Sequence, residues 1–463
     1  MGYIVGEDRA QASLLPARFE DYVAADAAVR VIDAFVDGLD LAVLGFGRAS
    51  PAGTGRPGYD PGDLLKLYVW GYFNEIRSSR RLERACRRDV EAMWLLCKLA
   101  PDFKTIADFR RDNGPAIVGA CRAFVLLCRD AGLFAARLVA LDGSKFRAAA
   151  SRKQVMGRRE IAEEAARLDR RIAAYLTGLD EADAAEPDDA PEAVEAALAA
   201  LRARRAELDR LAARLDDEGR TTLVEGEEDA RPMRSGRGPN PPSYNVQTVV
   251  DTETSLIVHH DVTDEATDRR LLHPMVRAAK DSLGLAALTV VADKGFDNGE
   301  HASACERDGI TACVPAQRAV NNQGDGRLFD RTSFVYDPGT DTHLCPGGRR
   351  LVRKQLNRKE RAITYASPDC SGCALKTRCT TAERRFVTRH LDEEAMARMA
   401  ARATPEMMRI RRCAAEHPFG TIKRMMAGGR FLTRNLRGTR TEMALSVLAY
   451  NIRRAVSLGS ATA

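Results

Sequence analysis

The sequence predicts a multidomain α/β protein, and three of its features support that class. Apolar runs with strand propensity end in acidic residues at two distant places, Asp142 and Asp293. Helical periodicity dominates the segment from Pro61 to Leu133 and returns in a long stretch after the first acid. At 463 residues and 45% hydrophobic composition, the chain can bury a large core and is long enough for roughly two or three structural units.

Residues 1–135 are predicted to form a helical N-terminal domain. One apolar helix face is made by Leu64, Leu65, Tyr68, Val69 and Tyr72. The segment that follows carries a cluster of arginines, which includes Arg80 and Arg84. Such a cluster could contact DNA phosphates. A solvated helix face whose arginines pair with Glu83 and Asp89 explains the same residues equally well.

A helical-hairpin insertion is predicted at about residues 152–220, inside an α/β core whose first part spans residues 136–318. Its apolar positions are Ile161, Ala165, Leu168, Ile172 and Tyr175, followed by Val194, Leu201, Leu208 and Leu215 at intervals of seven. An acidic segment with prolines separates the two runs, from Gly178 to Pro191. This pattern favours an antiparallel hairpin of the coiled-coil type. The hairpin could serve in dimerisation, although a self-contained hairpin needs fewer assumptions.

The other elements of the core follow an order that indicates a ribonuclease-H-like α/β domain. After a first strand that ends at Asp142 come a β-hairpin, a helix, a strand that ends at Asp293, a further helix and a last strand. The elements after the insertion are expected at residues 244–260, 269–283, 288–293, 300–308 and 310–315. Both acids then lie at strand ends, where this architecture gathers its functional groups.

A second insertion, at residues 319–392, contains four of the eleven cysteines of the chain. They are Cys345, Cys370, Cys373 and Cys379. Two of them form a Cys-x2-Cys pair, so four thiolates could hold a structural zinc ion, with His343 as a substitute ligand. The spacing is irregular, and unliganded thiols explain the cysteines equally well. An odd number of cysteines without a secretion signal argues against a disulfide framework.

Charge and hydropathy narrow the classes of function only moderately. Lysine and arginine number 71 against 65 acidic residues, so the net charge of +6 requires any nucleic-acid affinity to come from local clusters. The N-terminus lacks a signal pattern, and the best apolar run is interrupted by Arg122. We therefore expect a cytoplasmic protein with no membrane partner.

Residues 393–463 carry a charged pattern on a predicted helix. Arg412, Glu416 and Lys423 are four and seven residues apart, which places them on one helix face. Pro418 lies between them and is expected to kink the helix. From Gly428 to Arg440 we expect a loop, whose Arg430 and Arg434 are well placed to meet phosphates, and from Thr441 to Val456 a closing helix.

These motifs together resemble the DDE-type transposases of bacterial insertion sequences. The resemblance rests on Asp142 at the end of a strand, on Asp293 before Lys-Gly-Phe, and on Arg412-x3-Glu416-x6-Lys423. The phrase Glu-His-Pro-Phe-Gly-Thr-Ile-Lys is similar to that of the insertion-sequence group numbered 1182, related to the insertion-sequence 4 and 5 families. The resemblance runs from about Tyr59 onward. The chain departs from the related signature at Arg409, where that signature has a tyrosine.

The resemblance implies a transposase that works with two metal ions. Asp142, Asp293 and Glu416 would hold Mg2+, for which Mn2+ can substitute, while Lys423 and Arg412 would hold phosphates. The reaction would be hydrolysis at each transposon end to free a 3′-hydroxyl, followed by attack of that hydroxyl on target DNA. The partners would be double-stranded DNA, as inverted repeats and as target, and at least one further copy of the chain.

Two alternatives keep parts of this assignment. A catalytically inactive DNA-binding protein derived from a transposase would retain the basic helices and the cysteines. A ribonuclease-H-like nuclease would cut nucleic acid without joining strands. Intact acids at all three positions weigh against the first alternative, and strand joining would exclude the second.

Overall fold

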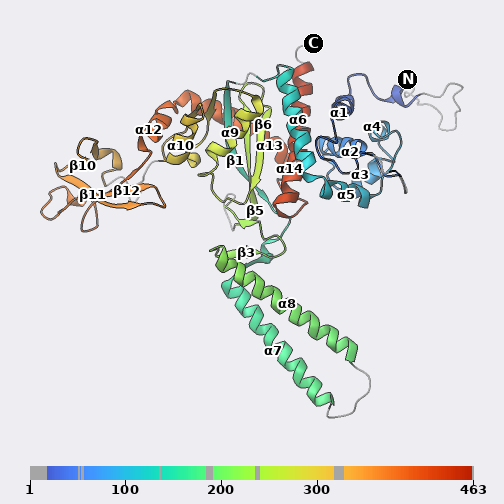
Figure 1. The fold of residues 1–463 in the computed structure, drawn as a ribbon, viewed down its shortest axis with the longest axis horizontal. Helices are drawn as coiled ribbons and strands as arrows, with labels where there is room; N and C mark the ends of the chain where they lie inside the picture. Colours follow the sequence, from blue (N-terminus) through green and yellow to red (C-terminus); the bar gives the residue numbers. More distant parts are fainter. Residues whose placement is uncertain are drawn as a thin grey trace, which may run out of the picture.

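A mixed six-stranded sheet forms the centre of the protein (Figure 1). The structure is a computed structural model that describes residues 18–50, 53, 57–134, 137–183, 191–234, 240–317 and 328–460. The strands are β1 (Leu138–Arg147), β4 (Arg231–Pro232), β5 (Pro242–Asp251), β6 (Ile257–Thr263), β7 (Leu288–Val291) and β8 (Ile310–Cys313). Their order is β4-β5-β1-β7-β8, with β6 paired to β5.

The strand pairing matches the predicted order of elements and fits a ribonuclease-H-like arrangement. β1, β7 and β8 run parallel to one another, whereas β5 is antiparallel to both β1 and β6. Parallel neighbours need helical crossovers, and the chain supplies them between β6 and β7 and between β7 and β8. Ala140 of β1 pairs with Val291 of β7, and each strand reaches its acid two residues further on. Asp142 and Asp293 therefore lie side by side, at the same level of the sheet.

Helices cover both faces of this sheet. On one face, α9 (Leu272–Leu283) and α10 (Gly299–Arg307) pack on Leu141 and Val290 in a continuous apolar core, against which α12 (Glu393–Arg402) also packs. On the other face, α13 (Pro405–Met425) packs beside Ala140 and Val291, and α14 (Asn435–Ser460) packs against β6. The alternation of side chains along β1 thus sends Asp142 toward α13 and Gly143 toward the opposite face.

The N-terminal helices share their core with the central domain. They are α1 (Ala28–Asp37), α2 (Pro61–Phe73), α3 (Ser79–Ala85), α4 (Val90–Leu95), α5 (Phe103–Asp112) and α6 (Gly114–Asp130). α14 packs against α6 and α2 (Figure 1). One apolar cluster runs without interruption from the helical region, through Trp70 and Tyr72, to Leu445 and Leu448 of α14. The helical region is therefore docked rigidly on the central sheet.

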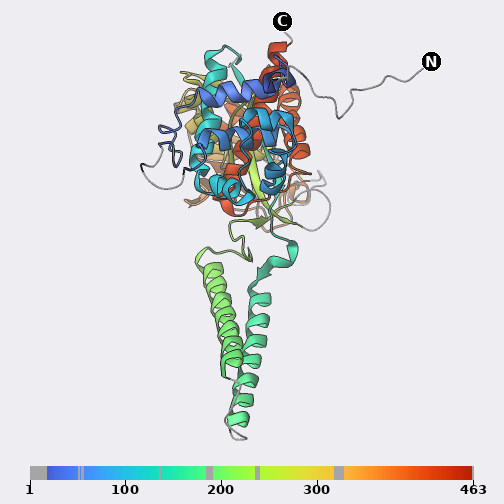
Figure 2. The ribbon, with the colours of Figure 1, turned by 90° about the vertical axis from the view of Figure 1, so that its right-hand side faces the viewer.

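The predicted helical hairpin is present and projects away from the sheet (Figures 1 and 2). It consists of α7 (Arg158–Asp183) and α8 (Pro191–Asp217), which lie within the predicted 152–220. Ile161, Leu168, Leu208 and Leu215 fill its core near the base, where β2 (Val155–Gly157) and β3 (Thr222–Val224) pair as a short ribbon.

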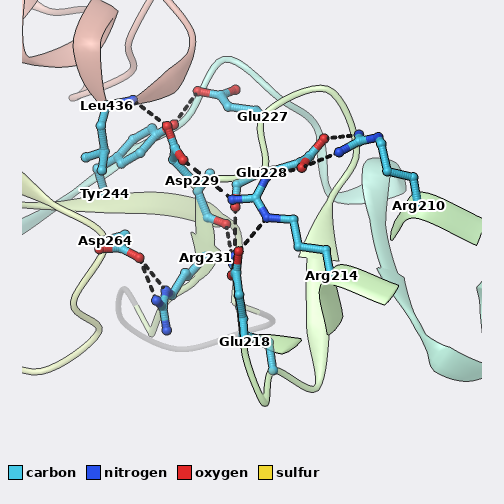
Figure 3. A network of polar contacts seen from close by, with 12 residues as sticks. Arg210, Arg214, Glu218, Glu227, Glu228, Asp229, Arg231, Tyr244, Asp264 and Leu436 are labelled. Atoms are coloured by element: carbon cyan, nitrogen blue, oxygen red, sulfur yellow. Dashed lines mark hydrogen bonds and ion pairs between the residues drawn. The ribbon is translucent and has the colours of Figure 1, made fainter. Parts of the chain in front are cut away.

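A polar network anchors the hairpin to the central domain (Figure 3). Glu228 receives Arg210 and Arg214 of α8, while the adjacent Asp229 accepts a hydrogen bond from the backbone N–H of Leu436 at 2.9 Å. Glu227 accepts hydrogen bonds from the Ala150 N–H and from the hydroxyl of Tyr244 in β5. Three consecutive acids thus tie α8 to β5 and to the start of α14.

The same network explains why α14 begins earlier than the sequence predicts. The segment from Gly428 to Arg440 was expected to be a loop, yet the helix begins at Asn435. The acceptor for its first turn is Asp229, which lies about 200 residues away in the chain and is invisible to a local reading. Arg440 consequently lies on the helix, where it pairs with Asp261 at 2.9 Å.

The cysteine-containing insertion folds as a separate five-stranded antiparallel sheet (Figure 1). Its elements are β9 (Val335–Asp337), β10 (Thr342–Leu344), β11 (Arg350–Asn357), β12 (Ala362–Ala366), β13 (Phe386–His390) and the short α11 (Lys376–Cys379), in the strand order β13-β12-β11-β10-β9. Its core is small and includes Phe334, Leu351 and Tyr365.

Within the described residues, no helix of the protein is both long and apolar enough to cross a membrane.

Candidate active site

Asp142 lies within β1, beyond the point at which β7 ends beside it. Only 14% of its side chain is exposed, and its Oδ1 accepts a hydrogen bond from the Gly143 N–H at 2.9 Å. Burial raises the pKa of Asp142 to about 6, against the opposing effect of Arg411, and the neighbouring charge of Asp293 adds to the rise. An added positive charge near Asp142 would therefore stabilise its ionised form.

Asp293 follows β7 and caps a short 3-10 helix, Lys294–Phe296. Its Oδ1 accepts a hydrogen bond from the Gly295 N–H at 2.7 Å, which leaves Oδ2 directed elsewhere. The side chain is 45% exposed. The Lys-Gly-Phe sequence thus serves to turn the chain at the strand end and to fix the orientation of this acid.

Glu416 lies on α13, which packs across β1 and β7. The helix continues from Pro405 to Met425 through Pro418, so the predicted kink does not separate Glu416 from Lys423 into different elements. With 67% of its side chain exposed, Glu416 is the most accessible of the three acids. The three predicted acids therefore approach one another from a strand, a strand end and a helix.

One cation that the sequence did not single out lies among the three acids. Nη2 of Arg411 lies 2.5 Å from Asp142 Oδ1 and 3.5 Å from Asp293 Oδ2, and its Nη1 lies 4.0 Å from Glu416 Oε1. Arg412, which the spacing favoured, is exposed instead. Helical spacing alone could not tell which of the two adjacent arginines reaches inward.

Lys423 lies about two helical turns beyond Glu416 and reaches back to β1. Its Nζ donates to Ser144 Oγ at 2.6 Å and lies 5.4 Å from the centroid of the Phe146 ring. Burial lowers the pKa of Lys423, while the charge of Asp142 opposes that change. Ser144 and Asp142 share one face of β1, so Lys423 adds a positive charge beside the acids.

A fourth acid, Asp268, approaches the site from the opposite face of the sheet and was not predicted. Its Oδ1 accepts hydrogen bonds at 2.7 Å from both Asn245 and Gln247, and Lys145 Nζ lies 3.4 Å away. Gly143 makes this close approach possible, since a Cβ there would lie 2.1 Å from Gln247 Nε2. The negative charge of Asp268 also contributes to the raised pKa of Asp142.

Two further acids near this part of the sheet, Asp261 and Asp264, have partners elsewhere. Asp261 pairs with Arg440, and Asp264 pairs with Arg231 at 2.5 Å. Asp268 lies four residues beyond Asp264 in the same connection to α9, and no pattern of spacing distinguishes it.

The arginines predicted to contact phosphates are exposed. Arg80 and Arg84 lie on the surface of α3, where Arg80 lies 5.0 Å from the centroid of the Phe103 ring. Arg430 and Arg434 are exposed in the connection between α13 and α14, and Arg430 donates to the Ala149 carbonyl at 2.7 Å. Arg77, at the start of the same basic cluster, is buried instead.

The four cysteines of the insertion line one small cavity, with about 20 Å³ of space. The Arg349 N–H points to Cys345 Sγ at 3.4 Å, and a Cβ at Gly347 would lie within 3.7 Å of the sulfurs of both Cys345 and Cys373. His343 does not line this cavity; its ring is buried between Tyr336 and Tyr365.

The residues present fit a divalent cation in charge and in donor type. Asp142, Asp293 and Glu416 already converge on a positively charged group, Arg411, and carboxylate oxygens are the ligands that Mg2+ and Mn2+ prefer. Throughout the described part of the chain, no group of three or more His, Cys, Asp or Glu side chains stands ready to hold a metal ion. Side-chain rearrangement around Arg411 would therefore have to accompany metal binding.

Two known protein families match parts of this chain. The family described as "Transposase domain (DUF772)" matches residues 17–112, and the family described as "Transposase DDE domain" matches residues 215–452. Among solved structures, a piggyBac transposase synaptic complex with hairpin DNA, determined by cryo-electron microscopy, matches at 8% identity over 96% of this chain and 74% of that chain, with a TM-score of 0.34. No curated protein matches the chain. Because the second family spans more than half of the 463 residues, the chain belongs to the transposases with a DDE domain.

Proposed function

We propose that this transposase cuts DNA at the ends of an insertion sequence and joins the freed 3′-hydroxyls to target DNA, with Asp142, Asp293 and Glu416 as the metal-binding acids. The observation that carries the proposal is the convergence of these three acids, from three remote segments, on one positive charge. Isolated surface acids would pair with separate partners, as Asp261 and Asp264 do.

In this proposal the protein contributes metal ligands and phosphate-binding side chains. Asp142, Asp293 and Glu416 would hold Mg2+ or Mn2+, which would supply activation of an oxygen nucleophile and stabilisation of the leaving oxygen of a phosphodiester. The chain itself supplies the three carboxylates and, beside them, the ammonium of Lys423 at Ser144, where it can hold a phosphate of the scissile strand. The exposed Arg412, Arg430 and Arg434 would bind neighbouring phosphates.

Magnesium-dependent cleavage and joining tests this function directly. Purified full-length protein is incubated with duplex DNA that contains the sequence flanking its coding region, once with Mg2+ and once with a chelator. We expect 3′-hydroxyl ends and joined products with Mg2+ alone. Cutting without joining would favour a nuclease, and binding without cutting would favour an inactive DNA-binding protein; either result overturns the proposal.

The finer identity of the element is also a proposal. The phrase from Glu416 to Lys423 supports membership in the insertion-sequence group numbered 1182. Such an element should carry short inverted repeats on both sides of the coding region. Since two ends must be cut together, we further propose that the active form contains at least two copies of the chain.

We also propose that Cys345, Cys370, Cys373 and Cys379 bind a structural zinc ion. All four line one cavity, and a backbone N–H directed at Cys345 Sγ would stabilise a thiolate there. A metal staple suits this insertion because its sheet has a small apolar core. Because His343 is buried outside the cavity, the proposal takes the four thiolates as the ligand set, and they would have to draw together to hold the ion.

Elemental analysis of the purified protein tests the zinc proposal. We expect about one zinc ion per chain, as for other four-cysteine structural sites. Cys373→Ser should lower the zinc content, whereas Cys97→Ser, at an exposed cysteine outside the insertion, should not. Equal zinc content in the two variants would rule the site out.

A further inference from the structure

Arg411 holds an unusual position for an arginine on a surface helix. Its side chain is only 13% exposed, and one of its nitrogens, Nη2, contacts both Asp142 and Asp293. These two acids come from adjacent strands of the sheet, whereas Arg411 comes from α13, as does Glu416. A single guanidinium therefore closes the gap between the helix and the sheet at the candidate metal site.

The charges around Arg411 are not balanced. Three carboxylates surround one positive charge, and only Asp142 lies at a short hydrogen-bonding distance. Within the described residues, its buried Nε has no hydrogen-bond partner. The unsatisfied Nε makes this position costly for the arginine, and the surplus of acids leaves a net negative charge that an added cation could neutralise.

Arg411 and a metal ion compete for the same oxygens. An ion held by Asp142 and Asp293 would need the region between their carboxylates, which Nη2 now fills. Two cations a few ångströms apart repel each other, and the repulsion is strongest where the charged groups are buried, as Arg411 and Asp142 are. Metal binding by these acids and the present position of Arg411 are therefore mutually exclusive.

We propose that Arg411 is a releasable counter-ion, which holds the acids in the free protein and moves onto a DNA phosphate when DNA binds, so that metal ions load together with DNA. The inference rests on the proposed function and concerns its regulation. A guanidinium suits this exchange because its fork of donors pairs as well with phosphate as with carboxylate. Lys423, at Ser144, marks the adjacent place at which a phosphate would be bound.

This exchange links metal binding to DNA binding. When DNA takes Arg411, the acids lose their internal partner and gain affinity for an added cation. Reciprocity requires metal ions to raise DNA affinity by the same factor. Without DNA the site would remain occupied by its own arginine, which would limit the cleavage that a preloaded metal centre could cause at random sites.

The experiment is a titration of the full-length, DNA-free protein with Mn2+, followed by the electron paramagnetic resonance of free Mn2+. The variants are Arg411→Gln, Arg411→Lys and, as a matched control, Arg409→Gln, which removes an exposed arginine from the same helix. We expect Arg411→Gln to bind Mn2+ at least about tenfold more tightly than the unaltered protein. Arg411→Lys should bind with intermediate affinity, and Arg409→Gln should match the unaltered protein.

The direction of the change separates a counter-ion from a structural arginine. If Arg411 only supported the fold, its removal would scatter the acids and weaken Mn2+ binding. Equal or weaker binding by Arg411→Gln, with circular dichroism showing a folded protein, would overturn the inference. If Arg411→Gln does not fold, Mn2+ binding by Arg411→Lys that is no tighter than that of the unaltered protein overturns it as well.

The test is also independent of catalysis. A gain in Mn2+ affinity without any DNA cleavage would support the counter-ion role of Arg411 and reject the proposed function. Cleavage of end DNA without a gain in Mn2+ affinity would do the reverse.

Discussion

Arg77 and Arg411 are both buried beside carboxylates, and the two places differ in how completely the charges are satisfied. Arg77 joins the N-terminal helices to α14 through Glu442, at 2.8 Å, and also donates to the carbonyl of Arg430. The oxygens of Glu442 receive further hydrogen bonds from the Leu432 and Thr433 N–H groups and from the Thr433 hydroxyl. Each charge there has one opposite charge, and the carboxylate is saturated with donors.

Arg411 has the opposite surroundings. It faces three carboxylates, and a fourth, Asp268, lies behind Gly143. The balanced pair serves the fold, because nothing further can bind to it without breaking it. The unbalanced cluster can accept more positive charge, as expected of a site that has been shaped for binding rather than for stability.

The largest effect is expected at the unbalanced cluster. Asp142→Asn removes a carboxylate that lies closest to Arg411, and we expect cleavage of end DNA to fall by at least about 1,000-fold, since a metal ligand contributes several kcal/mol to the transition state. The stability of the fold should not fall, because the change removes one of several repelling acids. Cleavage rates and thermal unfolding measured on the same preparation check both expectations.

A matched substitution elsewhere controls for the loss of an aspartate. Asp261→Asn removes a partly exposed carboxylate that pairs with Arg440 outside the site. Cleavage should stay within about twofold of the unaltered protein, since exposed ion pairs contribute little. A near-normal rate for Asp142→Asn, or an equal loss in both variants, would contradict the assignment of the acids.

The balanced pair should show the reverse pattern. Glu442→Gln leaves the buried Arg77 without an opposite charge, and we expect the free energy of unfolding to fall by about 3 kcal/mol. Urea denaturation measures that change. Glu75→Gln, at a partly exposed glutamate 3.8 Å from Arg453, is the control and should change stability by less than about 0.5 kcal/mol. Similar losses in both variants would remove the distinction between the two regions.

The sequence carried much of this architecture, because the relevant signals are local. A buried apolar run that leads to an acid was readable at both Asp142 and Asp293, and the order of elements then predicted that the two would meet. The predicted end of the first strand at Asp142 was wrong, because β1 continues to Arg147 through its pairing with β5. Helical spacing placed Glu416 and Lys423 on one helix, and Pro418 did not interrupt it. These features depend on residues a few positions apart, which periodicity can detect.

Other features depend on contacts that the sequence does not encode locally. The choice between Arg411 and Arg412 depends on which side chain reaches across to β1. Asp268 can approach the site only because Gly143 has no side chain. The sheet of the cysteine-containing insertion was missed for another reason. β11 is exposed at almost every position, so it lacks the alternation that marks a strand with one buried face.

A smaller effect is expected at Lys423, which borders the unbalanced cluster without lying among its acids. Lys423→Gln removes a charge next to Ser144, and we expect cleavage to fall by about 10- to 100-fold, the range for a charged hydrogen bond to phosphate of about 1.5–3 kcal/mol. Lys423→Arg should recover part of the rate. Loss of stability in place of activity would assign Lys423 to the balanced, structural class.

The smallest effect is expected at an exposed arginine for which the described residues show no buried partner. Arg84 is exposed on α3, only seven residues from the buried Arg77. If it contacts a DNA phosphate, Arg84→Ala should reduce the salt dependence of DNA binding by about one unit of slope. Its stability should change by less than about 0.5 kcal/mol, since no apolar contact or saturated pair is lost. Filter binding at several salt concentrations measures the slope. An unchanged slope would make this stretch an ordinary solvated helix face, and it would then follow that burial among acids, rather than membership in a basic cluster, marks the arginines that function requires.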